Sequence, residues 1–199
     1  MTDKQREDEL LSHYHRFFGP HNRIETYGAG PSGAPEAISV VEFGPKSSDE
    51  VWVYVTLGAS SRPMPEPGNG DGEPSGYRVE YMFYSSDREP VVNDVLANLA
   101  VQPFLQGEVY RDGVTIPGPP DGLFPQSPLT DLLLAKPYFL DEDFDVVLHR
   151  DGSHTHILWA IPIYPSERLF AEQHGDLALF DLFMEHEIDS SDLHRSPVI

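Results

Sequence analysis

The sequence predicts an α+β fold, in which a mainly antiparallel sheet is flanked by helices in a single compact domain. Its length of 199 residues is typical of one domain, and we assign residues 1–199 to one unit. Segments rich in β-branched and aromatic residues are interspersed with helical patterns along the chain. No expected strand is followed promptly by a helix and a parallel partner, so the pattern disfavours a parallel α/β architecture.

The first helix is expected at residues 3–18. Its apolar side chains recur at three- and four-residue spacing along one stripe: Leu10, Leu11, Tyr14, Phe17 and Phe18. Gly19 and Pro20 end this helix, because glycine adopts the left-handed cap conformation and proline cannot continue a helix. The polar, glycine-rich residues 21–35 are expected to form a loop.

Three strands with a long interruption are expected next. Residues 37–43 and 51–57 have the β-branched and aromatic composition of an antiparallel hairpin. Residues 58–76 hold four prolines and five glycines, which predicts a long loop of the functional or disordered kind. Residues 77–84 then resume a strand pattern. Its alternation places four side chains on one face: Tyr77, Val79, Tyr81 and Phe83.

The second half of the chain mixes short strands and helices. Strands are expected at residues 107–110, 129–134, 146–150 and 154–163. Helices are expected at residues 90–101, 166–174 and 177–184. The turn Asp151-Gly152 predicts a hairpin between the last two strands, and Pro162 predicts that the end of the final strand is an edge or has left the ladder. Asp176 is expected to cap the last helix, and the polar tail 189–199 to fray.

Charge and composition exclude several classes of function. The sequence has 13 Lys and Arg residues against 33 Asp and Glu residues, for a formal net charge of −20. This charge repels nucleic acid and anionic membranes, whereas it suits a basic protein partner or simply keeps the protein soluble. The absence of cysteine excludes disulfides, thiolate metal sites and a cysteine nucleophile. The longest apolar run is about eight residues and the N-terminus is charged, so we expect a cytoplasmic protein.

Cofactor and catalytic motifs are weak. Residues 28–33 satisfy the G-x-G-x-x-G pattern, but a strand rather than a helix is expected to follow, so we interpret them as a loop. The sequence carries no P-loop, G-x-S-x-G or H-E-x-x-H motif. His154 and His156 share one face of their expected strand, and His149 lies across the turn, which allows a zinc site. The simpler interpretation is that these histidines cover the solvent face of the hairpin.

Several blocks of sequence occur in an order and spacing that resemble the suppressor-of-fused-like domain. They are residues 51–58 around Trp52, residues 74–77 followed by Glu80 and Phe83, residues 127–129, residues 157–168, and His174-Gly175 before a leucine-rich helix. The resemblance covers about residues 36–187. It implies a non-enzymatic α+β domain. Eukaryotic members bind a transcription-factor peptide between this domain and a second one, for which we expect no room here. Stand-alone bacterial members resemble immunity proteins, which neutralise a toxin by covering it.

The preferred hypothesis is therefore a protein-binding module, an antitoxin-like immunity protein with a basic toxin as partner and with no cofactor or metal. The candidate contact residues lie on the long loop and on an acidic segment: Glu66, Asp71, Glu73, Tyr77, Asp141, Glu142, Asp143 and Asp145. Addition of a partner strand to a sheet edge is the alternative docking mode. Two other classes stay open, namely a small hydrolase or metal enzyme that uses His149, His154 and His156, and a self-associating regulatory subunit. The sequence leaves the oligomeric state undetermined.

Overall fold

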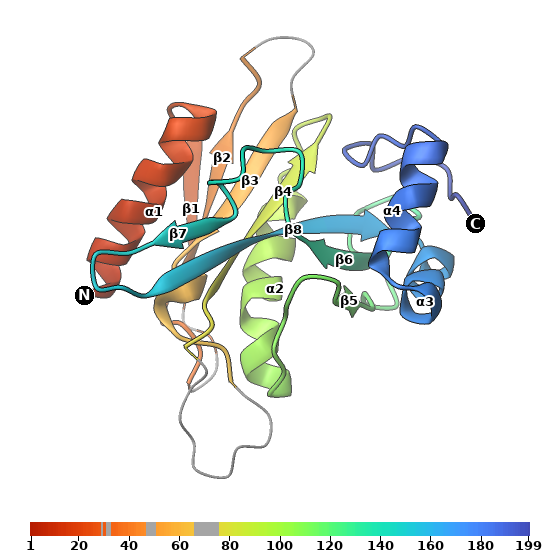
Figure 1. Ribbon diagram of the computed structural model, residues 1–199. Helices are drawn as coiled ribbons and strands as arrows, with labels where there is room; N and C mark the ends of the chain where they lie inside the picture. The colour runs from red at the N-terminus through yellow and green to blue at the C-terminus, as the bar shows by residue number, and fades with distance from the viewer. Residues whose placement is uncertain (29, 31–32, 47–50, 66–75) are drawn as a thin grey trace.

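The structure is a computed structural model that describes residues 1–28, 30, 33–46, 51–65 and 76–199 (Figure 1). Its helices are α1 (Asp3–Phe18), α2 (Val91–Gln106), α3 (Pro165–His174) and α4 (Asp176–Glu185), with a short 3-10 helix η1 (Ala59–Ser61). Its strands are β1 (Arg23–Tyr27), β2 (Ile38–Phe43), β3 (Trp52–Leu57), β4 (Val79–Ser85), β5 (Thr115–Ile116), β6 (Asp131–Ala135), β7 (Val146–Leu148) and β8 (His154–Ile163).

All of these strands belong to one sheet, whose order is β1-β2-β3-β4-β8-β6-β5, with β7 paired to β8 beside β6. Neighbouring strands are antiparallel except β4 and β8, which run parallel with Val79 opposite His156. The predicted α+β class and the mainly antiparallel sheet are therefore confirmed. Pro162 lies beyond the part of β8 that pairs with β4, so its missing N–H interrupts no bond to that strand.

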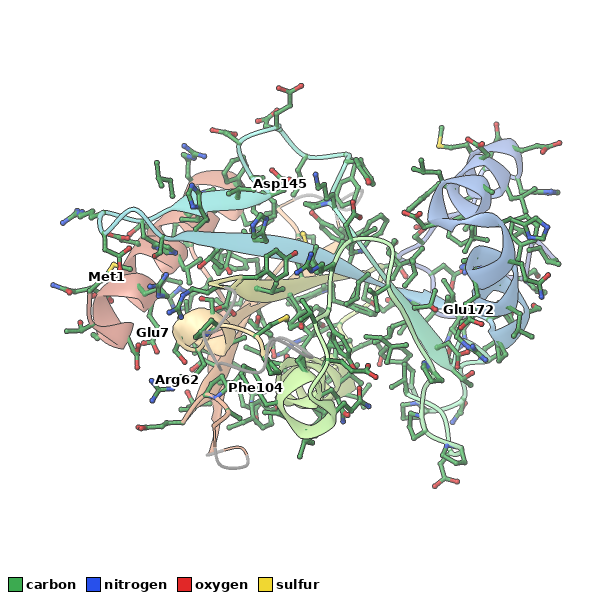
Figure 2. All side chains as sticks on the ribbon, turned by 60° about the horizontal axis from the view of Figure 1, so that its bottom comes forward. Met1, Glu7, Arg62, Phe104, Asp145 and Glu172 are labelled. Atoms are coloured by element: carbon green, nitrogen blue, oxygen red, sulfur yellow. The ribbon has the colours of Figure 1, made fainter. Side chains whose placement is uncertain are left out.

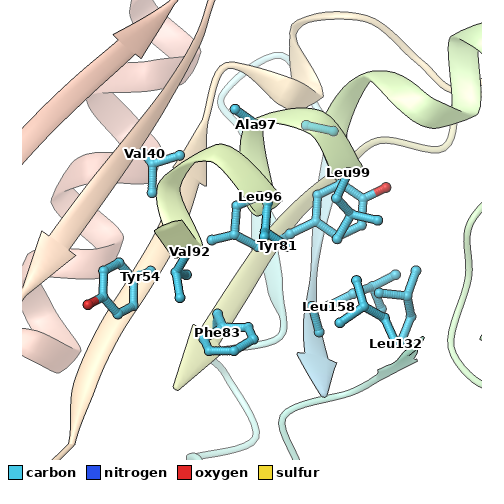
Figure 3. Close-up of a cluster of buried hydrophobic side chains, with 14 of the residues drawn as sticks. Val40, Tyr54, Tyr81, Phe83, Val92, Leu96, Ala97, Leu99, Leu132 and Leu158 are labelled. Atoms are coloured by element: carbon cyan, nitrogen blue, oxygen red, sulfur yellow. The ribbon is translucent and has the colours of Figure 1, made fainter. Parts of the chain in front are cut away.

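Helices cover the two faces of the sheet unequally. Helix α2 packs on one face, where Tyr54, Tyr81, Phe83 and Leu96 form the centre of a buried cluster (Figure 3). On the opposite face, α1 lies at one end of the sheet and the α3–α4 pair lies at the other (Figure 1). Because both faces are covered, all seven residues of β4 are buried. Val79, Tyr81 and Phe83 all belong to the cluster on the α2 face, which confirms the predicted alternation.

The loop 136–145, which connects β6 to β7, fills the space between α1 and the α3–α4 pair. Its Phe144 is fully buried, and the ring lies 4.9 Å from Phe17 and 5.3 Å from Phe18 between ring centroids. The Phe144 ring thereby packs the loop against α1 and the sheet. Helix α1, the loop and the C-terminal helices together form an incomplete third layer of the fold.

Several local predictions were wrong, each for a physical reason. Within residues 21–35, expected as a loop, β1 forms an edge strand, and an edge needs no apolar alternation because one side of it faces solvent. Residues 107–110 are not a strand, and the β-structure there begins at β5. Gly175 rather than Asp176 occupies the N-cap of α4. Helix α2 extends past the expected end at residue 101 to Gln106.

The C-terminal tail 189–199 does not fray as expected. Leu193 and Arg195 are 6% exposed each, and Tyr164 donates its hydroxyl to the backbone oxygen of Arg195 at 2.6 Å. The tail therefore packs as part of the domain. Among the described residues, no helix has both the length and the apolar character that a membrane crossing requires.

Candidate protein-binding surface

The predicted acidic residues Asp141, Glu142, Asp143 and Asp145 all lie on the 136–145 loop. The first three are exposed, and Asp145 is half-buried at the point where the loop enters β7. Figure 2 shows this loop projecting from the sheet, with Asp145 near its base. The local sequence explains the arrangement: Phe144 enters the core, so the charged residues before it are turned toward solvent.

Helix α1 anchors the 136–145 loop, which we call the acidic loop, at two points. The Nη2 of Arg16 donates to Oδ2 of Asp143 at 2.8 Å, in an exposed ion pair. The Nε2 of His13 donates to the backbone oxygen of Phe144 at 3.0 Å. Burial lowers the pKa of His13, and the hydrogen bond to Phe144 partly offsets this effect. The acidic loop is therefore held in place before any partner binds, which reduces the ordering cost of binding.

An apolar groove, which we call the Phe139 groove, borders the acidic loop. It has two lobes of about 440 and 340 Å³ that share Val51, Tyr84 and Phe139. The first lobe is completed by α1 and Asp141, and the second by Trp159 and the segment that begins at Ile188. Six segments of the chain thus build one hollow.

Phe139 is the exposed centre of this groove. Its side chain is 52% exposed, and its ring packs edge-on against Trp159 at 4.7 Å and Tyr84 at 5.0 Å between centroids. The neighbouring Tyr138 is 56% exposed, and its hydroxyl donates to Asp112 at 3.2 Å. Exposed aromatic side chains on a rigid support are typical anchors of protein interfaces. Sequence reasoning missed them, although two adjacent aromatic residues before an acidic run were the available signal.

The structure does not bring Tyr77 to this groove. Tyr77 packs with the buried cluster on the α2 face, whereas Asp141 lines the groove on the opposite face. The Tyr77 ring lies 4.7 Å from the His156 ring, and the guanidinium of Arg111 lies 5.2 Å from it. Burial accordingly raises the pKa of Tyr77. The other predicted contact residues, Glu66, Asp71 and Glu73, lie outside the described residues.

The three histidines of the alternative metal hypothesis do not converge. His149 is 2% exposed, with Nδ1 at 2.9 Å from Glu9 and Nε2 at 2.8 Å from Thr155 Oγ1. Thr155 alternates with His154 and His156 along β8, so it lies on the other face. In the part of the chain that the structure describes, no group of three or more His, Cys, Asp or Glu side chains could hold a metal ion.

A buried carboxylate fixes the entry to the long loop. Glu80 accepts hydrogen bonds from Thr56 Oγ1 at 2.6 Å and from the backbone and hydroxyl of Ser60 at 2.9 and 2.7 Å. Burial raises its pKa, and these donors partly offset that effect. Gly58 is required at the turn, because its φ is 106° and a Cβ would lie 2.8 Å from the oxygen of Ala37. We interpret this cluster as structural.

The fold and this surface define a class: an α+β domain with an anchored acidic loop beside an aromatic groove, a combination suited to binding another protein. The family model described as suppressor of fused protein (SUFU) matches residues 34–196, and the chain belongs to that family. The resemblance seen in the sequence over residues 36–187 is thereby confirmed.

Comparison with known proteins supports the same family. The chain is 22% identical to "Immunity protein YqcF" of Bacillus subtilis (strain 168) over 165 residues, which are 82% of each protein. It is similar to the crystal structure of a SUFU homologue from Neisseria gonorrhoeae FA 1090, with a TM-score of 0.75, 24% identity and 98% coverage of both chains. It also resembles a chain of a Sufu–Fu complex, with a TM-score of 0.65, 15% identity, and coverage of 98% of this chain and 91% of that chain. At these identities the structural likenesses show the fold.

Proposed function

We propose that this protein is a non-enzymatic immunity protein of the cytoplasm, which binds a basic toxin and neutralises it by occlusion. The observation that carries the proposal is the anchored acidic loop beside the exposed aromatic groove. The name of the Bacillus subtilis relative supports the class of function, and the Sufu–Fu complex supports protein binding within the fold. The net charge of −20 supports a basic partner.

Occlusion places physical demands on the surface, and the described groove and loop suit them. A stable complex buries about 800 Å² on each partner, with a few aromatic anchors at the centre and polar groups around them. Phe139 and Tyr138 supply exposed aromatic area. Asp141 and Glu142 supply charge, and among the described residues the ion pair on this loop is that of Arg16 with Asp143 rather than with either of them. A partner's cations would therefore meet carboxylates that are available to them.

The experiment that tests the function begins with capture. The tagged protein is incubated with native host lysate at low salt and then washed at moderate salt. We expect one basic protein to be retained stoichiometrically and released by salt. That protein should be toxic when expressed alone, and co-expression of this chain should restore growth. A captured protein whose expression is harmless, or no stoichiometric partner, would contradict the proposal.

A matched pair of variants links the function to the surface. Glu142→Lys changes the charge of the acidic loop, and Glu185→Lys makes the same change at an exposed position on α4. Because only the first alters the proposed surface, we expect Glu142→Lys to weaken rescue of growth and Glu185→Lys to leave it intact. Equal effects of the two variants would show that net charge, rather than this surface, determines binding.

A further inference from the structure

We propose that the Phe139 groove receives one apolar side chain of a protein partner, carried on a segment with Lys or Arg on both sides of that side chain. This inference rests on the proposed function and specifies the chemistry of the partner. It follows from three properties of the described residues: the aromatic walls of the groove, the acidic group in each of its lobes, and an unpartnered donor in a residue of its wall.

The aromatic walls indicate an apolar occupant. Tyr84 and Trp159 are 8% exposed each, so their rings form the floor, whereas Phe139 stands between the lobes with half of its surface in solvent. Each lobe is within the range of about 300–1,000 Å³ that is typical of sites for organic groups. Filling a lobe would cover the exposed ring of Phe139 and remove apolar surface from water.

The acidic groups in the two lobes select the flanking residues. Asp141 lines the first lobe and Asp189 lines the second, so a segment that occupies both lobes meets a carboxylate in each. Among the residues the structure describes, Asp143 is engaged by Arg16, but no Lys or Arg pairs with Asp141 or Asp189. Asp189 accepts the backbone N–H and hydroxyl of Ser191 at 2.9 and 2.7 Å, which fixes its carboxylate beside the groove.

One residue that lines the second lobe also carries an unpartnered donor. The Nε1 of Trp159 is buried and has no hydrogen-bond partner among the described residues, although its ring lines the second lobe. A buried donor without an acceptor is unfavourable, and native proteins usually satisfy it. Because this atom is buried, an oxygen of a bound peptide segment would accept its hydrogen bond once the wall shifts on binding.

The larger hollow between α1 and β7, about 870 Å³, carries no comparable selection. Its charged side chains are already paired with opposite charges: Glu9 with Arg150, Asp8 with Lys4, Arg16 with Asp143, and Asp151 with Arg6. Among the described residues, these pairs leave no uncompensated charge in this hollow that would select a partner of opposite charge. The Phe139 groove, by contrast, combines apolar shape with carboxylates that no Lys or Arg among the described residues engages.

A peptide titration followed by nuclear magnetic resonance tests the inference without a known partner. The probe is a blocked Arg-Phe-Arg tripeptide, with blocked Glu-Phe-Glu and Arg-Gly-Arg as controls. The chain has two tryptophans, so the indole region gives two N–H signals, and Trp52→Phe assigns the one from Trp159. We expect Arg-Phe-Arg to shift the Trp159 signal in a saturable manner, and each control peptide to shift it about tenfold less at the same concentration.

Two variants locate the effect. Phe139→Ala and Asp141→Lys should each weaken the response to Arg-Phe-Arg about tenfold, whereas Glu185→Lys should leave it unchanged. An unshifted Trp159 signal, or an equal response to Glu-Phe-Glu, would overturn the inference. The proposed function is tested separately by capture: a toxin that binds wild-type protein and Phe139→Ala equally well would refute the groove and leave the immunity role standing. Failure to capture any toxin would refute the role, while the peptide result would still decide the groove.

Discussion

Arg195 and Glu167 form a buried ion pair that joins the C-terminal segment to the first turn of α3. The Nη2 of Arg195 donates to Oε2 of Glu167 at 2.6 Å, and Nη1 donates to Oε1 at 2.8 Å. The side chains are 4% and 0% exposed. The same carboxylate accepts the backbone N–H of Tyr164 at 2.9 Å and of Val198 at 3.2 Å. One carboxylate thus connects the start of a helix, a distant arginine and the last residues of the chain.

Removing the arginine alone should be strongly destabilising. In Arg195→Met, Glu167 keeps its charge in a buried site and loses both guanidinium donors. We expect the free energy of unfolding to fall by about 3–5 kcal/mol, as for other broken buried pairs. Urea denaturation with an unchanged slope measures this loss. Arg150→Met is the control, because Arg150 is exposed and its pair with Glu9 should contribute less than about 1 kcal/mol.

The double variant Glu167→Gln with Arg195→Met should lose less stability than the two single variants together. The amide carries no charge, and its oxygen still accepts the N–H of Tyr164. We expect a coupling energy of about 1–3 kcal/mol between the two positions. Additive losses in the double-mutant cycle would show that the pair contributes through packing of Arg195 against Phe183 rather than through charge.

Two phenylalanines of the same loop should differ in their roles. Phe144→Ala removes a fully buried ring, so we expect a loss of about 3–5 kcal/mol in the free energy of unfolding. Phe139→Ala removes a ring that is 52% exposed, so we expect a loss of about 1 kcal/mol or less. Thermal unfolding of the two variants, measured side by side, checks this contrast. Similar losses would mean that Phe139 belongs to the core and is not a binding anchor.

Local patterns in the sequence predicted most of the elements. Helix α1, strands β2 to β4 and the β7–β8 hairpin all have the periodicity or turn residues of their own structure, so each was found at nearly its observed bounds. The edge strand β1 was missed because a strand with one exposed side has no such pattern. The tail was expected to fray because its residues are polar, whereas Arg195 is buried and forms an ion pair with Glu167, 28 positions earlier.

The candidate surface was predictable only in part. The acidic residues 141–145 are adjacent in sequence, so composition alone indicated them. The Phe139 groove combines residues from α1, β3, β4, β8 and two loops, and this juxtaposition depends on the order of strands in the sheet. Tyr77 was predicted as a contact residue because it is an aromatic side chain beside the long loop, but it lies on the sheet face opposite Asp141. Both the groove and the position of Tyr77 therefore depend on how distant strands pair in the sheet, which local sequence patterns do not specify.

Asp151 should titrate well below the usual range of an aspartate. The hydroxyl and backbone N–H of Ser153 donate to it, with Arg6 nearby, and lower its pKa to about 2 from 3.8. Because the unfolded chain then binds more protons, Asp151 contributes stability above pH 3.8 that is lost as the pH falls toward 2. Carbon-detected titration should show a midpoint near 2 in the wild type. In Ser153→Ala we expect that midpoint to rise toward 3.8, and an unchanged midpoint would contradict the assigned cause.

The last prediction concerns the rate at which the acidic loop finds its partner. Exposed charges at the border of an interface mainly steer the encounter, so reversing them changes association more than dissociation. With the captured partner, Asp141→Lys combined with Glu142→Lys should slow association about tenfold at low salt and change dissociation about twofold. Stopped-flow measurements at several salt concentrations should also show a weaker salt dependence in the variant. The same dependence in wild type and variant would place the contact surface elsewhere on the protein.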